Sequence, residues 1–134
     1  MSLGRSPSTS SRKRILIVED DPDARDVLGE MIGALGHDAF KASTALEAIK
    51  HAECTPLDLV LIDLSLPDTD GFEVARRIRG IVSNSGARLV ALTGYSDAES
   101  RRSATLAGFD DFLVKPAYGT ALEELVNARP LRSA

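Results

Sequence analysis

Three consecutive carboxylates, Glu19, Asp20 and Asp21, directly follow the apolar run at residues 15–18. Two carboxylates about 4 Å apart repel each other by roughly 4 kcal/mol near a protein surface, so a partner must offset the repulsion. Asp21 has an ordinary explanation, because an aspartate followed by Pro22 is a typical helix start and its charge suits the helix dipole. Glu19 and Asp20 lie upstream of that start, at the end of a strand that we expect to be buried. A cation is the partner that we expect for them.

Further polar side chains follow other apolar runs at the same relative place: Asp63, Thr93 and Lys115. Ligands of an open α/β sheet bind at the carboxyl ends of its strands, so these groups are expected to meet Glu19 and Asp20 at one edge. The carboxylates suit Mg²⁺, which prefers hard oxygen ligands. Lys115 and Thr93 suit phosphoryl oxygens instead. Asp63 is then either a metal ligand only, or also a nucleophile that forms an aspartyl phosphate.

These groups must be positioned by strands and helices that alternate along the chain. Short apolar runs predict strands at residues 15–18, 39–42, 59–62, 89–92 and 112–114. Apolar residues at helical spacing occupy the stretches between these runs. The alternation predicts a doubly wound α/β domain, with a five-stranded parallel sheet and helices on both faces.

Local signals mark where the helices begin and end. Capping-box pairs, which satisfy orphan N–H groups, occur at Thr44 and Glu47, Ser96 and Glu99, and Thr120 and Glu123. Gly36 and Gly108 stand where helices are expected to stop. The fourth helix, residues 97–107, has no large apolar residue before Leu106, so we predict that it is the least tightly held helix.

Four motifs in this order and spacing resemble the receiver domain of two-component response regulators. The motifs are Val-Glu-Asp-Asp at 18–21, Asp-Leu-Ser-Leu-Pro-Asp-Thr-Asp-Gly at 63–71, Ala-Leu-Thr-Gly at 91–94 and Phe-Leu-Val-Lys-Pro at 112–116. The resemblance runs from about residue 14 to residue 128 and implies a flavodoxin-like strand order, 2-1-3-4-5. The last two motifs and the residues around them are similar to receivers fused to hybrid histidine kinases.

The resemblance implies a chemical role for each residue of the predicted site. Asp63 would be the phosphoacceptor, which takes a phosphoryl group from a phosphohistidine. Glu19 and Asp20 would bind Mg²⁺ together with Asp63 and the backbone carbonyl of Ser65. Lys115 would pair with the phosphoryl group.

The resemblance also implies a switch. Thr93 would turn toward the phosphoryl oxygens, Phe112 would follow it inward, and the Lys115–Pro116 bond would be cis, a minority state even before proline. Tyrosine is common where Phe112 stands, so a signal that depends on a phenol hydroxyl is in doubt here. The fourth helix, fifth strand and fifth helix would form the partner-binding face.

The resulting expectation is a signalling domain that assists its own phosphorylation and dephosphorylation, and not an enzyme. Its partners would be a histidine kinase or phosphotransfer protein, and a downstream protein or linked domain that is absent from this chain. The alternative is a receiver-like protein-interaction module that is not phosphorylated.

Other chemistries fit the sequence less well. Asp68 to Gly71 hints at a calcium loop, but the register puts Leu66 and Arg77 at ligand positions. A phosphatase with an aspartate nucleophile usually needs a second carboxylate two residues later, where Ser65 stands. Glycine-rich nucleotide-binding motifs are absent from the sequence. His37 and His51 are expected to be surface histidines, and Arg76, Arg77 and Arg79 to form a solvated helix face.

Composition sets the remaining limits. The 134 residues are 43% hydrophobic and 27% charged, which fits one globular domain. We expect a disordered leader at 1–13, in part vector-derived, a receiver domain at 14–129 and a tail at 130–134. The leader carries three positive charges and no acid. Because the net charge of the whole chain is −4, the remaining residues carry a net charge of −7, which disfavours nucleic acid as a direct partner. The sequence has neither a membrane span nor a signal peptide, which indicates a cytoplasmic protein.

Overall fold

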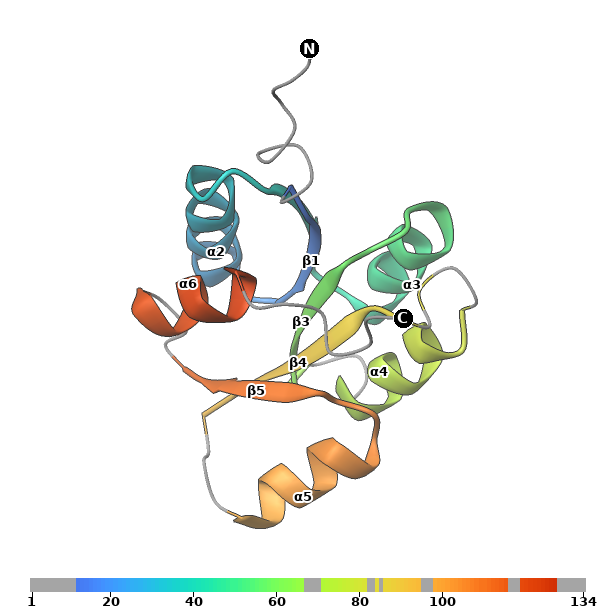
Figure 1. The fold of residues 1–134 in the computed structure, drawn as a ribbon. Helices are drawn as coiled ribbons and strands as arrows, with labels where there is room; N and C mark the ends of the chain where they lie inside the picture. Colours follow the sequence, from blue (N-terminus) through green and yellow to red (C-terminus); the bar gives the residue numbers. More distant parts are fainter. Residues whose placement is uncertain are drawn as a thin grey trace.

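The computed structural model describes residues 12–66, 71–81, 84, 86–94, 98–115 and 119–127. Strands and helices alternate through these residues (Figure 1). The strands are β1 (Arg14–Val18), β2 (Asp38–Ala42), β3 (Leu59–Asp63), β4 (Arg88–Thr93) and β5 (Asp111–Val114). The helices are α2 (Pro22–Ala34), α3 (Ala45–Cys54), α4 (Gly71–Arg79), α5 (Ala98–Leu106) and α6 (Thr120–Asn127). The predicted strands are confirmed to within one residue at each end.

The five strands form one parallel sheet in the order β2-β1-β3-β4-β5. This order confirms the doubly wound, flavodoxin-like architecture. The register brings the carboxyl ends of the strands to one edge: Val18 of β1 pairs with Ile62 of β3, and the next residue of β3, Asp63, pairs with Leu92 of β4. The predicted site residues that follow these strands therefore lie side by side.

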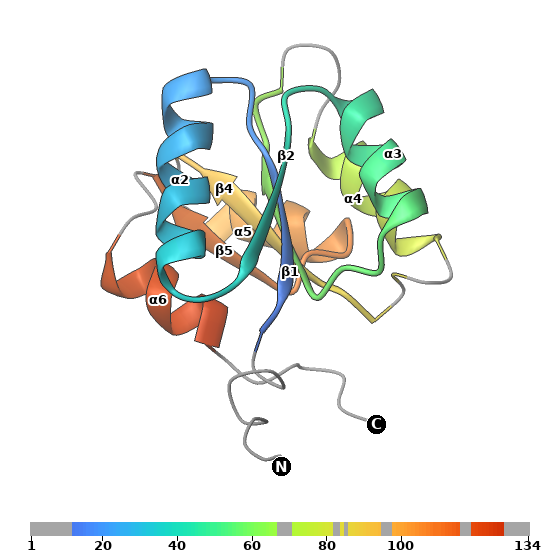
Figure 2. The same ribbon diagram turned by 90° about the horizontal axis from the view of Figure 1, so that it is seen from above.

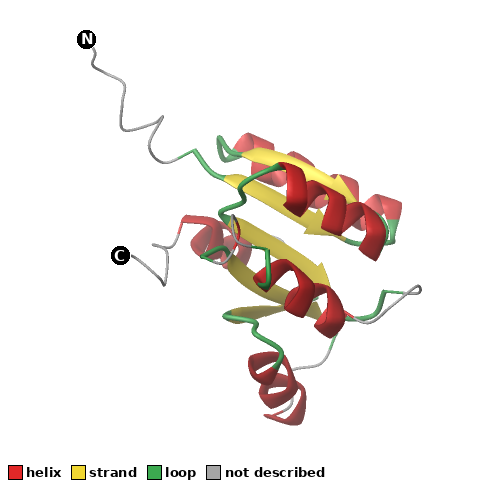
Figure 3. Ribbon diagram, turned by 90° about the vertical axis from the view of Figure 1, so that its right-hand side faces the viewer, coloured by secondary structure: helices red, strands yellow, loops and turns green. Residues whose placement is uncertain are grey.

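Helices cover both faces of the sheet (Figures 2 and 3). On one face, Ile15 and Ile17 of β1 belong to the core cluster that holds the buried side chains of α2 and α6. On the other face, Leu16 and Val18 pack in the cluster that holds the buried side chains of α3 and α4. Both sets of alternating positions are apolar because a parallel sheet is buried on both sides.

The helix starts agree with the sequence in two cases and differ in a third. The Asp21 carboxylate accepts a hydrogen bond from Ala24 N–H, and the Thr44 hydroxyl accepts one from Glu47 N–H. Thr120 lies inside α6, and the carbonyl of Gly119 closes the first turn by accepting from Glu123 N–H at 3.0 Å. Gly119 has φ +76°, a conformation that favours glycine, and it directly precedes the helix, so Thr120 is the first residue of α6 and not its cap. Ser96 lies outside the described residues.

Gly36 and Gly108 end α2 and α5 in the same way. Their φ angles are +94° and +105°, and the N–H of each donates to a carbonyl three residues earlier. The N–H of the next residue, His37 or Phe109, donates to the carbonyl five residues before it. This is the Schellman geometry, which requires a left-handed residue and so selects glycine.

Two polar residues that we expected at the surface are held inside. His37 is 7% exposed, and its Nδ1 accepts a hydrogen bond from Lys13 N–H at 2.9 Å. Arg79 donates to the carbonyls of Ala87 and Gly108 and pairs with Asp110 at 2.8 Å. The end of α4 is thereby joined to the turn after α5, so Arg79 does not belong to a solvated face.

The helix α5 packs lightly, as predicted. Among its described side chains Ala104 alone is buried, whereas α2 buries Leu28 and Ile32, and α6 buries Leu122, Leu125 and Val126. Leu106 at the end of α5 is 82% exposed. No helix within the described part of the chain is long and apolar enough to cross a membrane.

Candidate functional site

Three carboxylates meet at the carboxyl edge of the sheet. Glu19 and Asp20 follow β1 and Asp63 ends β3, and one oxygen from each of the three lies within 4.8 Å of the others. Glu19 and Asp63 are each 2% exposed, whereas Asp20 is exposed to solvent. The cluster that the sequence predicts therefore exists, with its outer side open to water through Asp20.

Lys115 reaches the two buried acids from the end of β5. Its Nζ lies 2.9 Å from Asp63 Oδ2 and 3.4 Å from Glu19 Oε1. Its backbone N–H donates to the carbonyl of Thr93 at 2.8 Å, which extends the β4–β5 pairing by one residue and fixes where the side chain starts. Burial lowers the pKa of Lys115, but the hydrogen bond and charge of Asp63 and the charge of Glu19 outweigh it and leave that pKa above its usual value.

The environments of the two buried acids shift their pKa values in opposite directions. Burial raises the pKa of Glu19 to about 7, and the neighbouring Asp63 adds to the shift against the opposing effects of Asp21 N–H and Lys115. Burial also disfavours the charge on Asp63, yet hydrogen bonds from Glu19, Ser65 N–H and Lys115 keep the pKa of Asp63 below its usual value. Asp63 is therefore the more acidic member of the pair.

The backbone around Asp63 is held closely. Ser65 N–H donates to Asp63 Oδ1 at 2.9 Å, which orients the carboxylate. A Cβ on Gly71 would stand 2.6 Å from the carbonyl oxygen of Asp63 and 2.9 Å from Leu64 Cα, so only glycine fits at the start of α4. The sequence did not reveal this contact. The Ser65 carbonyl as a metal ligand stays a prediction.

Thr93 and Phe112 lie on the same face of the sheet, toward α5. Phe112 pairs with Ala91, two residues before Thr93, and side chains two apart on a strand share a face. Thr93 is 6% exposed, and Phe112 is partly buried. The guanidinium of Arg101, from α5, covers the Phe112 ring at 4.5 Å from its centre. Pro116 lies outside the described residues, so the cis bond stays a prediction.

Two arginines near the site were missed by the sequence reasoning. One is Arg101, and the other is Arg25, whose guanidinium donates to the carbonyl of Glu19 at 2.9 Å. Neither arginine belongs to a sequence motif. Each contacts its partner only when its helix packs beside the end of a strand, so the sequence alone did not indicate either contact.

The donor set fits Mg²⁺. Three carboxylates face one ammonium group, and carboxylate oxygens are the ligands that this ion prefers. Glu19, Asp20 and Asp63 would hold the ion. Mg²⁺ is usually bound by one or two carboxylates together with the phosphate of a substrate.

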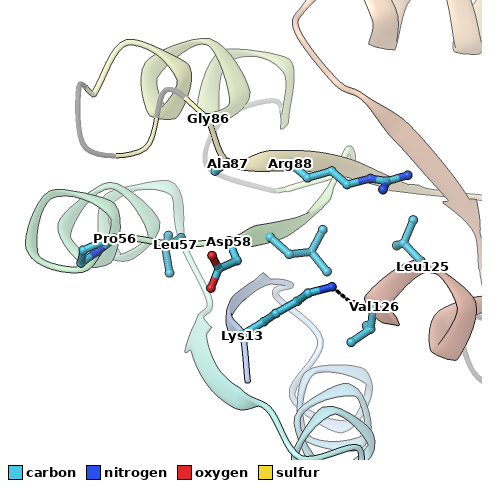
Figure 4. Close-up of a pocket in the computed structure, with 10 residues that line it drawn as sticks. Lys13, Pro56, Leu57, Asp58, Gly86, Ala87, Arg88, Leu125 and Val126 are labelled. Carbon is cyan, nitrogen blue, oxygen red and sulfur yellow. Dashed lines mark hydrogen bonds between the residues drawn. The ribbon is translucent and has the colours of Figure 1, made fainter. Parts of the chain in front are cut away.

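A separate pocket of about 280 Å³ lies at the opposite edge of the sheet, where the strands begin (Figure 4). Lys13 crosses it and donates to the carbonyl of Val126 at the end of α6, and Arg88 pairs with Asp111 at 3.1 Å. The cations of this pocket thus have protein partners, and the acidic cluster lies at the other end of the strands.

Comparisons with known proteins identify the family of the chain. The family model described as the response regulator receiver domain matches residues 15–127. The sensor histidine kinase AtsR of Burkholderia thailandensis is 39% identical over 117 residues, which are 84% of this chain and 19% of that protein. An uncharacterised 14.6 kDa protein of Leptolyngbya boryana is 36% identical over 118 residues, which are 88% of this chain and 90% of that protein. The chain thus spans nearly all of one relative and under a fifth of the other.

Solved structures give the same result. The receiver domain of a sensor histidine kinase from Pseudomonas aeruginosa, solved with a magnesium ion coordinated in its active site cleft, is 30% identical with a TM-score of 0.78. The similarity covers 86% of this chain and 94% of that one. A receiver domain protein from Methanospirillum hungatei is also 30% identical, with a TM-score of 0.78 over 86% of this chain and 90% of its own.

Proposed function

Because the chain belongs to the response regulator receiver domain family, we propose that it takes a phosphoryl group from a phosphohistidine onto Asp63 in a reaction that depends on Mg²⁺. Receiver domains are signalling modules of two-component systems. The observation that carries the proposal is the buried Asp63 carboxylate, which lies 2.9 Å from Lys115 Nζ and clusters with Glu19 and Asp20 at the carboxyl edge of the sheet. The donor would be a histidine kinase or a phosphotransfer protein.

The proposed transfer uses the groups that surround Asp63. A carboxylate oxygen of Asp63 forms a bond to phosphorus as the bond from phosphorus to the imidazole nitrogen breaks, and the electron pair of that bond leaves with the histidine. Lys115, at 2.9 Å from Asp63, is placed to pair with a phosphoryl oxygen as it arrives. A bound Mg²⁺ supplies positive charge that offsets the negative charge of the phosphoryl group.

Transfer from a phosphorylated histidine kinase to the full chain tests this proposal. We expect label on the wild-type chain in Mg²⁺, none on Asp63→Asn, and slow labelling of Asp20→Asn because that change removes a metal ligand. Labelling of Asp63→Asn at the wild-type rate would refute the assignment of the nucleophile. An unlabelled wild-type chain that still binds a partner would favour the alternative, a protein-interaction module that is not phosphorylated.

We also infer that the signal leaves through the surface of α5, β5 and α6. Leu106 is 82% exposed and Val114 of β5 is 43% exposed, so this surface offers apolar groups to a downstream protein or a linked domain. Thr93 lies on the face that α5 covers, next to Phe112. Movement of the Thr93 hydroxyl toward a phosphoryl group would leave space for Phe112 and shift α5 between two placements.

Hydrogen exchange with and without a beryllofluoride mimic of the phosphoryl group tests this output surface. We expect the changes in protection to fall within residues 94–118. Changes confined to α2 and α3 would refute the output surface and leave the phosphorylation chemistry standing.

A further inference from the structure

The Arg25 side chain joins α2 to the acidic loop by two hydrogen bonds. Its guanidinium Nη1 donates to the backbone carbonyl of Glu19 at 2.9 Å and to that of Asp20 at 3.4 Å. Its own backbone N–H donates to the carbonyl of Asp21 at 2.9 Å. This backbone bond is the ordinary first-turn bond of α2, so the arginine side chain itself contacts the first two carbonyls of the acidic run.

These carbonyls need donors because the sheet ends where the run begins. Glu19 N–H donates to the carbonyl of Ala42 on β2, beyond the last register pair of these two strands, Val18 with Ala42. The chain then turns into α2, and within the described residues Arg25 is the donor that pairs with the Glu19 and Asp20 carbonyls. The Glu19 carbonyl is partly buried and needs a protein donor, which Arg25 supplies, whereas the bond to the Asp20 carbonyl is longer and exposed to solvent. The peptide planes that carry the two acids are fixed as a result.

We propose that Arg25 is a positioning residue for the metal-binding loop, holding the Glu19 and Asp20 backbone so that their carboxylates converge on Asp63. This inference rests on the proposed function in taking the carboxylates as Mg²⁺ ligands. Substitution of a residue that orients metal ligands without touching the metal typically weakens metal binding 10-fold to 100-fold.

Two roles for Arg25 predict opposite results. If only its positive charge mattered, its loss would remove a repulsion and Mg²⁺ would bind more tightly. If its hydrogen bonds position the loop, its loss weakens Mg²⁺ binding even though a repelling charge has gone. Both side-chain bonds of Arg25 come from one nitrogen, Nη1. Lysine keeps the positive charge but places its donor on a different, more flexible side chain, so Arg25→Lys keeps the charge while changing the position of the donor.

Calorimetric titration of the full chain with Mg²⁺ tests the inference in wild type, Arg25→Met and Arg25→Lys. We expect about 10-fold weaker binding for Arg25→Met and a smaller loss for Arg25→Lys. Arg76→Met is the matched control, because Arg76 is also a helical arginine with a side-chain partner, Glu73, but lies on α4 with 55% of its side chain exposed. It should bind Mg²⁺ like the wild type.

Labelling by a small phosphodonor supplies a second readout. For Arg25→Met we expect the rate to need more Mg²⁺ but to approach the wild-type rate at saturating Mg²⁺, which a general loss of structure would not produce. Mg²⁺ affinity equal to or tighter than wild type in Arg25→Met would overturn the inference. Should that variant not fold, wild-type affinity in Arg25→Lys would overturn it. Absence of Mg²⁺ binding by the wild type would instead refute the metal site of the proposed function.

Discussion

Mg²⁺ binding should compete with a proton on Glu19. Burial beside Asp63 raises the pKa of Glu19 to about 7, so the buried acid is largely protonated below that pH. A metal ligand must be ionised, so metal binding expels the proton. With a pKa of about 7, the ionised fraction is about one tenth at pH 6 and about nine tenths at pH 8. We therefore expect the apparent Mg²⁺ affinity to rise roughly 10-fold between these pH values.

Calorimetry in buffers of different ionisation enthalpy measures the proton directly. Each Mg²⁺ bound should release about 0.9 proton at pH 6 and about 0.1 proton at pH 8. Glu19→Gln is the control: it should bind Mg²⁺ more weakly, with little dependence on pH in this range. Equal affinity and no proton release at pH 6 would show that Glu19 is already ionised, and would refute the account of a crowded, desolvated pair.

The same pKa sets the direction of a change in stability. Between its ordinary pKa of 4.5 and about 7, Glu19 binds a proton in the folded chain that it releases on unfolding, so its burial costs stability above pH 7 and this cost disappears as the pH falls toward 4.5. Without metal, Glu19→Gln should therefore gain stability over wild type at pH 8 and little at pH 5. A gain that is equal at both pH values, measured by urea unfolding, would contradict this linkage.

Three further changes follow from the structure. Asp20→Asn should stabilise the metal-free chain by on the order of 1 kcal/mol, because it relieves repulsion among the carboxylates, and its melting temperature should therefore rise. A lower melting temperature would contradict the repulsion. Gly71→Ala should destabilise the chain by about 1–3 kcal/mol, since its Cβ would meet the Asp63 carbonyl. Gly33→Ala should stabilise the chain by about 0.5–1 kcal/mol, because Gly33 lies in α2 with open space around it. Urea unfolding measures both changes. Arg101→Ala should cost about 0.5–1 kcal/mol and speed hydrogen exchange in α5, and unchanged exchange there would exclude the ring contact as an anchor.

Much of the site could be predicted because the chemistry follows the strands. In a parallel sheet the residue after each buried run lies at the same edge, so Glu19, Asp63 and Lys115 meet once the strand order is fixed. The glycine ends of α2 and α5 were equally local, since a left-handed residue after a helix leaves few choices.

The missed features depend on contacts between distant segments. In the sequence, Arg79 looks like part of a charged helix face, and only the fold shows that it pairs with Asp110, 31 residues later. In the sequence, His37 looks like an exposed loop residue, and only the fold shows that its ring accepts a hydrogen bond from Lys13 N–H. The pKa of Glu19 likewise depends on burial against Asp63, which its neighbours in sequence do not reveal.

Identification of the phosphorylated residue tests the central claim most directly. The full chain would be incubated with a small phosphodonor in Mg²⁺, and the labelled residue located by mass spectrometry after chemical trapping of the acyl phosphate. We predict one label, on Asp63, that disappears without Mg²⁺ and in Asp63→Asn. A label on another residue, or none on a chain that binds Mg²⁺, would contradict the account.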